Sequence, residues 1–273
     1  GKMAKIKINE DKCTRCNVCA SVCCMGIIEI AIDNQLPQIP REKQIYCLRC
    51  GHCEAYCKAG ALMMDYNVNP EPVPLNFNIK ADDVSMYFKN RRSVRHYQEK
   101  SVNNESLNKI LDTIRYAASG SNSQSTGYLI YQNREDVKRI SALTIDWMES
   151  ILNTDHPMAK YVGNIVELWK SGIDFISHNA PHLLIAHVPL SPWVEDITDG
   201  IIALTHFDLL APAYGLGTCW AGFIKMAYSE YKPLQQFIGL NSDRLLAYPM
   251  LFGYPVYKPF YIPERNPLQV EWR

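Results

Sequence analysis

The chain has 273 residues, a length that predicts one or two domains with a substantial core. Lys plus Arg and Asp plus Glu each number 28, so the charge balance does not indicate a nucleic-acid-binding or membrane-surface protein. The most apolar stretch, residues 201–224, is interrupted by His206, Asp208 and Pro212 and is not expected to span a membrane. The polar first residues, GKMAKIKINE, do not form a signal peptide, which predicts a cytoplasmic protein.

Ten cysteines are distributed very unevenly, with nine of them in the first 57 residues. CTRCNVCASVC begins at Cys13 and CLRCGHCEAYC at Cys47, and both follow the pattern C-x2-C-x2-C-x3-C. The second run repeats the first at a constant offset of 34 residues, which indicates an internal duplication. Without a secretory signal, so many thiols predict metal or redox chemistry rather than disulfides.

The composition changes after the second run. Residues 1–66 form the predicted cysteine-rich domain, and residues 67–80 contain Pro70, Pro72 and Pro74. Proline blocks helix formation and favours an extended segment, so residues 67–80 are predicted to be a linker. Residues 81–273 form the predicted second domain.

Helices and short strands alternate in this second domain. Asn103 or Asn104 is a candidate cap for a helix with one apolar face, and residues 129–131, 183–188 and 245–252 are predicted strands. A second helix is predicted from Asp199, its expected N-cap, to Tyr214, and Gly215 is its expected stop. That helix is apolar on most sides, so it is predicted to lie in a core or a subunit interface. The combination indicates an α+β fold.

The cysteine-rich domain resembles bacterial two-cluster ferredoxins along its whole length. In such proteins the fourth cysteine of each run binds the other cluster. The resemblance implies that one [4Fe–4S] cluster has the ligands Cys13, Cys16, Cys19 and Cys57. The second would have Cys47, Cys50, Cys53 and Cys23.

Two residues depart from the ferredoxin pattern, since Cys24 and Lys58 stand where proline usually follows the fourth cysteine. Cys24 is predicted to be a spare small residue, with ligand exchange as the alternative. Structural zinc is the alternative reading of the whole domain, although zinc sites usually have two separated pairs of ligands.

The second domain contains a candidate anion site and a candidate ring-binding segment. Arginine side chains in RRSVR suit a phosphate, and the amides of the AASGSNSQ segment suit the edge of a flavin ring. The anion-site residues are Arg91, Arg92, Ser93 and Arg95, and the amide residues are Asn122 and Gln124.

The order of these motifs, followed by APHLLIAH, AYGLGTCWAGF, GYP and ERNP, resembles the FMN-dependent nitroreductase family from about residue 85 onward. The resemblance implies a homodimeric fold with a mixed sheet flanked by helices and FMN at the dimer interface. The RRSVR segment would hold the phosphate and ribityl chain, and Asn122 and Gln124 the isoalloxazine. Ala221 and Gly222 would lie at the reactive face, with Arg265 as a second phosphate-side cation.

Together the two resemblances predict an oxidoreductase that passes electrons from two [4Fe–4S] clusters to FMN and on to a small acceptor such as a nitroaromatic or quinone. The expected electron donor is an external ferredoxin or flavodoxin, with NAD(P)H as another possibility. Two alternatives remain: a dehydrogenase that sends substrate electrons out through the clusters, and an electron-transfer module of a larger complex. No side chain is assigned as catalytic, because the flavin performs the hydride chemistry.

Several other polar residues are predicted to have structural roles. His178 and His182 are expected to be ordinary core or polar residues, since Pro181 disrupts a helical pairing. Cys219 is expected to be a buried thiol.

Overall fold

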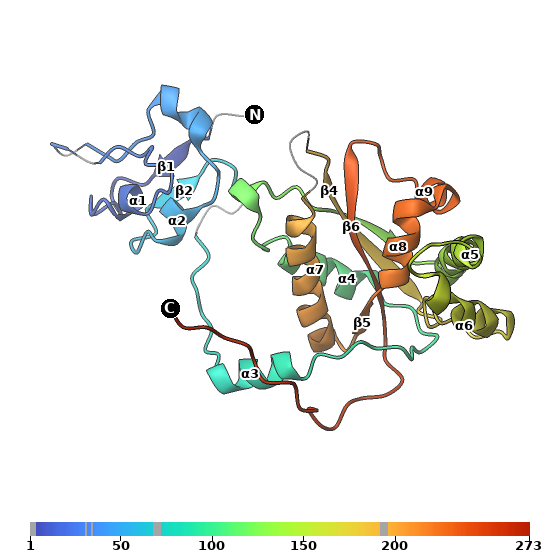
Figure 1. Cartoon of the computed structure of the whole chain (residues 1–273). Coiled ribbons are helices and arrows are strands. Elements are labelled where there is room, and N and C mark those ends of the chain that lie inside the picture. Colours follow the sequence, from blue (N-terminus) through green and yellow to red (C-terminus); the bar gives the residue numbers. More distant parts are fainter. Residues whose placement is uncertain (1–3, 31, 34, 68–71, 192–195) are drawn as a thin grey trace. The chain divides into compact units, whose positions relative to one another are not determined.

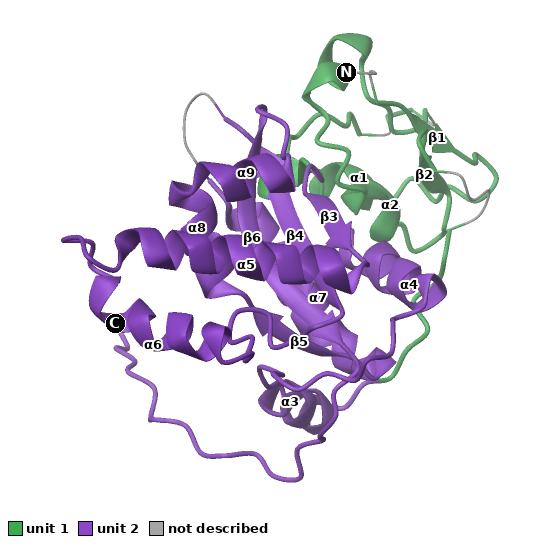
Figure 2. Cartoon of the chain, turned by 90° about the vertical axis from the view of Figure 1, so that its right-hand side faces the viewer, with its two compact units in different colours: residues 1–78, 120–123 green, residues 79–119, 124–273 purple. Residues whose placement is uncertain are grey.

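The structure is a computed structural model that describes residues 4–30, 32–33, 35–67, 72–191 and 196–273. The chain divides into two compact units (Figure 2). Unit 1 comprises residues 1–78 and 120–123, and unit 2 comprises residues 79–119 and 124–273. The division after Asn78 falls inside the predicted linker, of which residues 68–71 lie outside the described residues.

Unit 1 contains short elements connected by long loops (Figure 1). Its strands pair antiparallel, with Ile8 opposite Leu62. A small apolar core surrounds this pair and includes Ile27, Ile39 and Met64. The elements are β1 (Ile6–Ile8), α1 (Val18–Ser21), a 3-10 helix (Arg41–Tyr46), α2 (His52–Ala55) and β2 (Leu62–Met64).

The sequence duplication is also present in the backbone of unit 1. Helices α1 and α2 occupy equivalent places in the two runs, and each follows a residue in the left-handed region, Asn17 with φ of 59° and Gly51 with φ of 75°. Gly26 and Gly60, three residues after the fourth cysteines, also match, with φ of 60° and 58°. The two cysteine runs therefore fold as two copies of one loop–helix motif.

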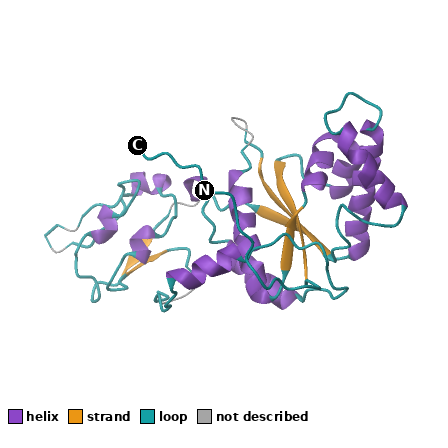
Figure 3. Cartoon of the chain, turned by 60° about the horizontal axis from the view of Figure 1, so that its bottom comes forward, coloured by secondary structure: helices purple, strands orange, loops and turns teal. Residues whose placement is uncertain are grey.

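Unit 2 is built on a four-stranded sheet in the order β3-β4-β6-β5. Figure 3 shows the strands in orange and the helices in purple. All neighbouring strands pair antiparallel, and the isolated parallel bridge between Ser93 and Thr218 makes the β5 edge mixed. The strands are β3 (Gly127–Tyr131), β4 (His182–Pro189), β5 (Gly217–Trp220) and β6 (Arg244–Gly253).

Helices cover both faces of this sheet (Figure 1). Side chains alternate between the faces of a strand, so Leu183 of β4 packs with α5, α6, α8 and α9 whereas Leu184 packs with α4 and α7. The helices are α3 (Ala81–Lys89), α4 (Asn104–Ile114), α5 (Arg134–Ile151), α6 (Ala159–Lys170), α7 (Thr198–Leu210), α8 (Gly222–Glu230) and α9 (Lys232–Ile238), with 3-10 helices at Gly120–Asn122 and Ala211–Tyr214.

The predicted helix boundaries are confirmed at most positions. The Asn103 side chain caps α4 by accepting a 2.7 Å hydrogen bond from the Ser106 N–H, and Gly215 stops the helical segment with φ of 74°. The prediction for the start of α7 was wrong: Ile197 is the N-cap, and Asp199 lies in the first turn. An acidic residue is favourable at either place, because the helix dipole is positive there.

None of the helices formed by the described residues is long and apolar enough to cross a membrane.

Candidate functional site

A cavity of about 490 Å3 in unit 1 brings together three cysteines of the first run and one of the second. Cys13, Cys16 and Cys19 line it from the loop before α1 and from α1 itself. Cys57 reaches it from the end of the second run. These four residues are the predicted ligand set of one cluster, and we call them the first cysteine set and their cavity the first cavity.

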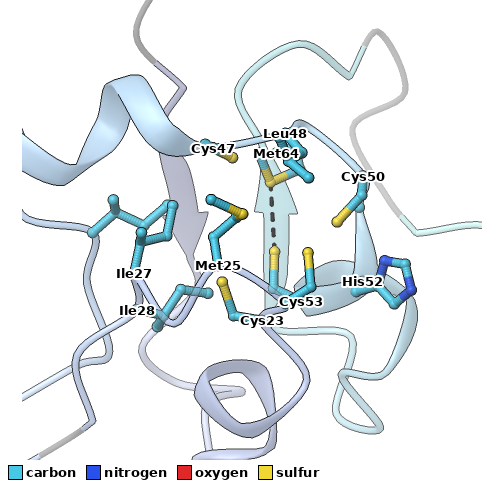
Figure 4. Close-up of a pocket in the computed structure, with 13 residues that line it drawn as sticks. Cys23, Met25, Ile27, Ile28, Cys47, Leu48, Cys50, His52, Cys53 and Met64 are labelled. Atoms are coloured by element: carbon cyan, nitrogen blue, oxygen red, sulfur yellow. Dashed lines mark hydrogen bonds between the residues drawn. The ribbon is translucent and has the colours of Figure 1, made fainter. Parts of the chain in front are cut away.

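The second cavity has the reciprocal arrangement (Figure 4). Cys47, Cys50 and Cys53 line it together with Cys23 of the first run. These four are the second cysteine set. This cavity is only about 20 Å3, because apolar side chains close in on it and the Met64 sulfur lies 3.6 Å from the Cys53 Sγ. The structure therefore gathers each predicted ligand set around its own cavity, while the presence of clusters in them stays a prediction.

The spacing of these sulfurs does not suit a single metal ion. No group of three or more His, Cys, Asp or Glu side chains among the described residues could hold one ion. Structural zinc requires four donors converging at about 2.0–2.3 Å from one point. A cubane spreads its four thiolates over four irons, so each cysteine set matches a cluster in the number and type of its ligands, although the second cavity, at about 20 Å3, is much smaller than the first.

Burial raises the pKa of one thiol in each set. It raises the pKa of Cys53 to about 12, and the nearby Cys47, Cys50 and Cys23 add to that shift. It also raises the pKa of Cys19. In the first set, by contrast, hydrogen bonds from the Val18 backbone and the Thr14 side chain lower the pKa of Cys16. Cys19 and Cys53 thus favour the neutral thiol form without a metal, and a bound metal cation would reverse that preference, because a coordinating thiol loses its proton.

A carboxylate fastens the second cavity to the small sheet. Glu54 in α2 accepts hydrogen bonds from the Met64 N–H at 3.0 Å and from the Asn67 amide at 2.6 and 2.7 Å. The α2 segment that contains Cys53 is thereby held against β2.

Unit 2 contains a cavity of about 300 Å3 beside the RRSVR segment, which we call the arginine cavity. Arg91 and Arg92 line it from one side, and Asp208 of α7 and Thr218 of β5 from another. Lys258 also contributes to the wall. Three cations and one carboxylate thus surround a space large enough for a phosphate-bearing group.

The Arg92 side chain is held by the backbone of two neighbouring residues, and one of its nitrogens has no partner. Its Nη1 donates to the carbonyl oxygens of Lys89 at 2.9 Å and Arg91 at 2.7 Å. Its Nη2 is buried and has no hydrogen-bond partner. A buried charged donor without a partner is costly, so this nitrogen fits an anionic ligand such as a phosphate.

Asp208 positions the other arginine. It lies buried in α7, accepts hydrogen bonds from the Thr218 hydroxyl and from the Trp220 Nε1 at 3.1 Å, and lies 3.6 Å from the Arg91 Nη1. Sequence reasoning did not identify this network, although a carboxylate near the end of a mostly apolar helix was a usable signal.

The RRSVR segment is held at the β5 edge by close packing. The Val94 N–H donates to the Thr218 carbonyl at 2.8 Å, and a Cβ added to Gly217 would lie 2.4–2.9 Å from the Val94 side chain. Only glycine therefore allows this approach. The packing explains why the segment adjoins the arginine cavity.

The structure does not place the other predicted flavin residues at the arginine cavity. Arg95 is exposed, and Arg265 is exposed in the C-terminal segment. Ser93 forms the bridge to Thr218. Buried Ala221 precedes α8, whose first residue is Gly222. The roles implied for all of them stay predictions.

The two amide residues occupy different environments. The Asn122 side chain donates to the carbonyl oxygens of Leu48 and Arg49, both at 3.0 Å, within unit 1. Gln124 is exposed with φ of 50°, and its N–H donates to the Ser119 hydroxyl at 3.0 Å. Their implied contacts with a flavin also stay predictions.

The residues predicted to be structural are largely in the core. His182 is buried, and its Nε2 accepts a 2.9 Å hydrogen bond from the Val102 N–H. Cys219 is buried as expected, and burial raises the pKa of its thiol.

Comparisons with known proteins agree with this architecture. Over 172 residues the chain is 24% identical to a proposed NADH dehydrogenase/NAD(P)H nitroreductase of Archaeoglobus fulgidus, covering 60% of this chain and 81% of that protein. A Bacteroides fragilis nitroreductase with bound FMN is 20% identical, covers 69% of this chain and 99% of its own, and has a TM-score of 0.54. A Desulfitobacterium hafniense nitroreductase with bound FMN is 17% identical, with coverage of 69% and 98% and a TM-score of 0.56. Residues 88–254, more than half of the chain, match the nitroreductase family. The protein therefore belongs to the nitroreductase family.

Proposed function

We propose that this protein is an FMN-dependent oxidoreductase whose unit 1 carries two [4Fe–4S] clusters and accepts electrons from an external carrier. The observation that supports it most is the crossed arrangement of the cysteines, in which each cavity takes three thiols from one run and the fourth from the other. This is the arrangement that two-cluster ferredoxins use.

The arginine cavity supports FMN as the second cofactor. Arg92 would bind the phosphate through its unpaired Nη2, and Arg91, held by Asp208, would add a second charge. Bound FMN supplies both one-electron and two-electron chemistry. The FMN-bound structures of family members with the same fold support this assignment.

The two cysteine sets support the iron–sulfur assignment. Cys13, Cys16, Cys19 and Cys57 would hold one cluster, and Cys47, Cys50, Cys53 and Cys23 the other. Iron–sulfur clusters supply one-electron transfer, with potentials tuned by hydrogen bonds to sulfur. Among the described residues, such donors include the Arg49 N–H at 3.4 Å from the Cys47 Sγ and the Ala61 N–H at 3.3 Å from the Cys57 Sγ.

A homodimer is part of the proposal. The C-terminal segment of unit 2 exposes large apolar side chains, with Phe260, Leu268 and Trp272 each at least 90% exposed. Clustered exposed apolar residues usually mark an interaction surface. A second copy of the chain is the proposed partner.

The proposed electron carrier is a ferredoxin or flavodoxin, and the proposed acceptor is a small molecule such as a nitroaromatic or quinone. A dedicated electron-transfer unit supports a protein carrier, since a nicotinamide could reduce the flavin without it. The Archaeoglobus relative, proposed to use NADH or NAD(P)H, makes the nicotinamide the competing donor to test.

Anaerobic stopped-flow measurement of flavin bleaching, with reduced ferredoxin and NAD(P)H offered separately, tests this proposal. We expect fast bleaching with ferredoxin, and we expect it to disappear when the first set is disrupted by Cys13→Ser. Fast bleaching by NAD(P)H and none by ferredoxin would refute the proposed donor. A purified protein without flavin would refute the whole proposal.

A further inference from the structure

We propose that Cys24 is a reserve ligand of the second cysteine set, able to take the place of Cys23. This inference rests on the proposed function, because it concerns how the chain holds an iron–sulfur cluster. It assigns a role to the ninth cysteine of unit 1, which the two sets of four leave unused.

The position of Cys24 relative to the second cavity supports this role. Cys23 and Cys24 both line that cavity, together with Cys47, Cys50 and Cys53, so five thiols surround the space expected to need four. Cys24 is also exposed to solvent, which allows its thiol to exchange a proton with water.

Two neighbouring ligands place Cys24 more closely. It directly follows Cys23 in the chain. Its thiol also shares a hydrogen bond with that of Cys50. The Cys24 sulfur therefore lies among the ligands of the second set.

The first cavity provides an internal comparison, because Lys58 occupies the place of Cys24 there. The backbone has the same hydrogen bond at both sites. The Cys23 N–H donates to the Ala20 carbonyl oxygen at 3.3 Å, and the Cys57 N–H donates to the Glu54 carbonyl oxygen at 3.0 Å. Lys58 lines the first cavity just as Cys24 lines the second. The same backbone thus presents a fifth thiol at one site and an ammonium group at the other.

The exchange is a ligand substitution without electron transfer. When the Cys23 thiolate is absent, the Cys24 thiol would release its proton to water, and its Sγ would bind at the iron position left by Cys23 and displace the solvent molecule held there. The oxidation state of iron does not change. The second site would therefore tolerate loss or oxidation of its fourth ligand, and the first site would not, because an ammonium group has no lone pair to donate.

Iron and acid-labile sulfide content of the full-length, anaerobically reconstituted protein tests the inference. Cys57→Ser should lose about half of both, because serine is a poor ligand and no thiol stands beside it. Cys23→Ser should keep nearly the wild-type content, and Cys23→Ser/Cys24→Ser should fall to about half. Equal losses in Cys23→Ser and Cys57→Ser would overturn the inference.

A gain of function gives an independent test that does not depend on the folding of Cys23→Ser. Lys58→Cys added to Cys57→Ser places a thiol where the second site has Cys24, so it should restore the iron lost from the first site. Failure to restore iron, while circular dichroism shows a folded protein, would contradict the role assigned to this position.

Alkylation reports on Cys24 directly. Peptide mass spectrometry after N-ethylmaleimide treatment should find Cys24 modified in the wild type and protected in Cys23→Ser. Modification in both proteins would overturn the inference. A wild-type protein that takes up iron but no sulfide, or neither, would instead refute the iron–sulfur part of the proposed function.

Discussion

The two units of this chain are stabilised in different ways. Unit 2 has a four-stranded sheet with an extensive apolar core on each face, formed with helices such as α5 and α7. Unit 1 has a two-stranded sheet and a small core that includes Ile27, Leu62 and Met64. A two-stranded sheet is marginally stable in water, and small domains usually need metals or disulfides. Burial can therefore sustain unit 2, whereas unit 1 is expected to depend on the clusters proposed for its cysteine sets.

Metal removal should produce the largest difference between the units. We expect an iron chelator to unfold unit 1, because metal binding supplies folding free energy in small metal domains. Unit 2 should keep its structure. Limited proteolysis would show cleavage within residues 1–78 and a protected fragment beginning near residue 79. If unit 1 stayed resistant to the protease after complete iron loss, the proposed difference in how the two units are stabilised would be wrong.

Arg92→Ala should weaken FMN binding by unit 2 without affecting the iron content of unit 1. Loss of a charge-assisted hydrogen bond costs about 1.5–3 kcal/mol, or about 10- to 150-fold in Kd. Fluorescence titration of the apoprotein with FMN measures this change. Arg115→Ala is the matched control, since Arg115 pairs with Asp112 on the exposed surface of α4. Equal affinities of the two variants would argue against the arginine cavity.

Gly217→Ala should destabilise unit 2 by about 1–3 kcal/mol, because the new Cβ overlaps Val94 at the β5 edge. Gly163→Ala in α6 is the control. Its Cβ would lie 3.5 Å from Leu152, an ordinary contact, so it should stabilise the helix by about 0.4–1 kcal/mol. Urea unfolding followed by tryptophan fluorescence measures both. The two substitutions should change the free energy of unfolding in opposite directions. If Gly217→Ala left that free energy unchanged, the close packing of Gly217 against Val94 would be contradicted.

A smaller effect is expected from pH. Burial lowers the pKa of His182, and burial together with Arg244 lowers that of His187. At low pH the unfolded chain then binds more protons than the folded chain. The contribution of these histidines to the free energy of unfolding is therefore fully present above about pH 6.5, and it is lost as the pH falls through the folded pKa values. Urea midpoints at decreasing pH measure this slope. His182→Gln keeps an acceptor for Val102 and should reduce the slope; an unchanged slope would exclude His182 as a cause.

The sequence predicted features that depend on local chemistry. The α4 cap at Asn103, the stop at Gly215 and the strands β4 and β6 follow from capping preference, glycine conformation and apolar runs. The crossed cysteine sets were implied by the resemblance of the two runs to bacterial two-cluster ferredoxins, in which the fourth cysteine of each run binds the other cluster.

Features that depend on distant residues could not be predicted. Arg91 and Asp208 meet only because the sheet brings α7 beside the RRSVR segment. Strand β5 was not predicted, because Gly217 follows closely after the helix stop at Gly215 and was assigned to the helix cap, whereas the structure uses it to admit Val94. The N-cap of α7 is Ile197 and not the predicted Asp199, because an acidic residue is equally favourable in the first turn of a helix.

Native mass spectrometry of the anaerobically purified protein would test the central claim most directly. The account predicts a mass for each chain that corresponds to the polypeptide with one FMN and two [4Fe–4S] clusters. A mass showing FMN with zinc, or FMN on an otherwise metal-free chain, would contradict it.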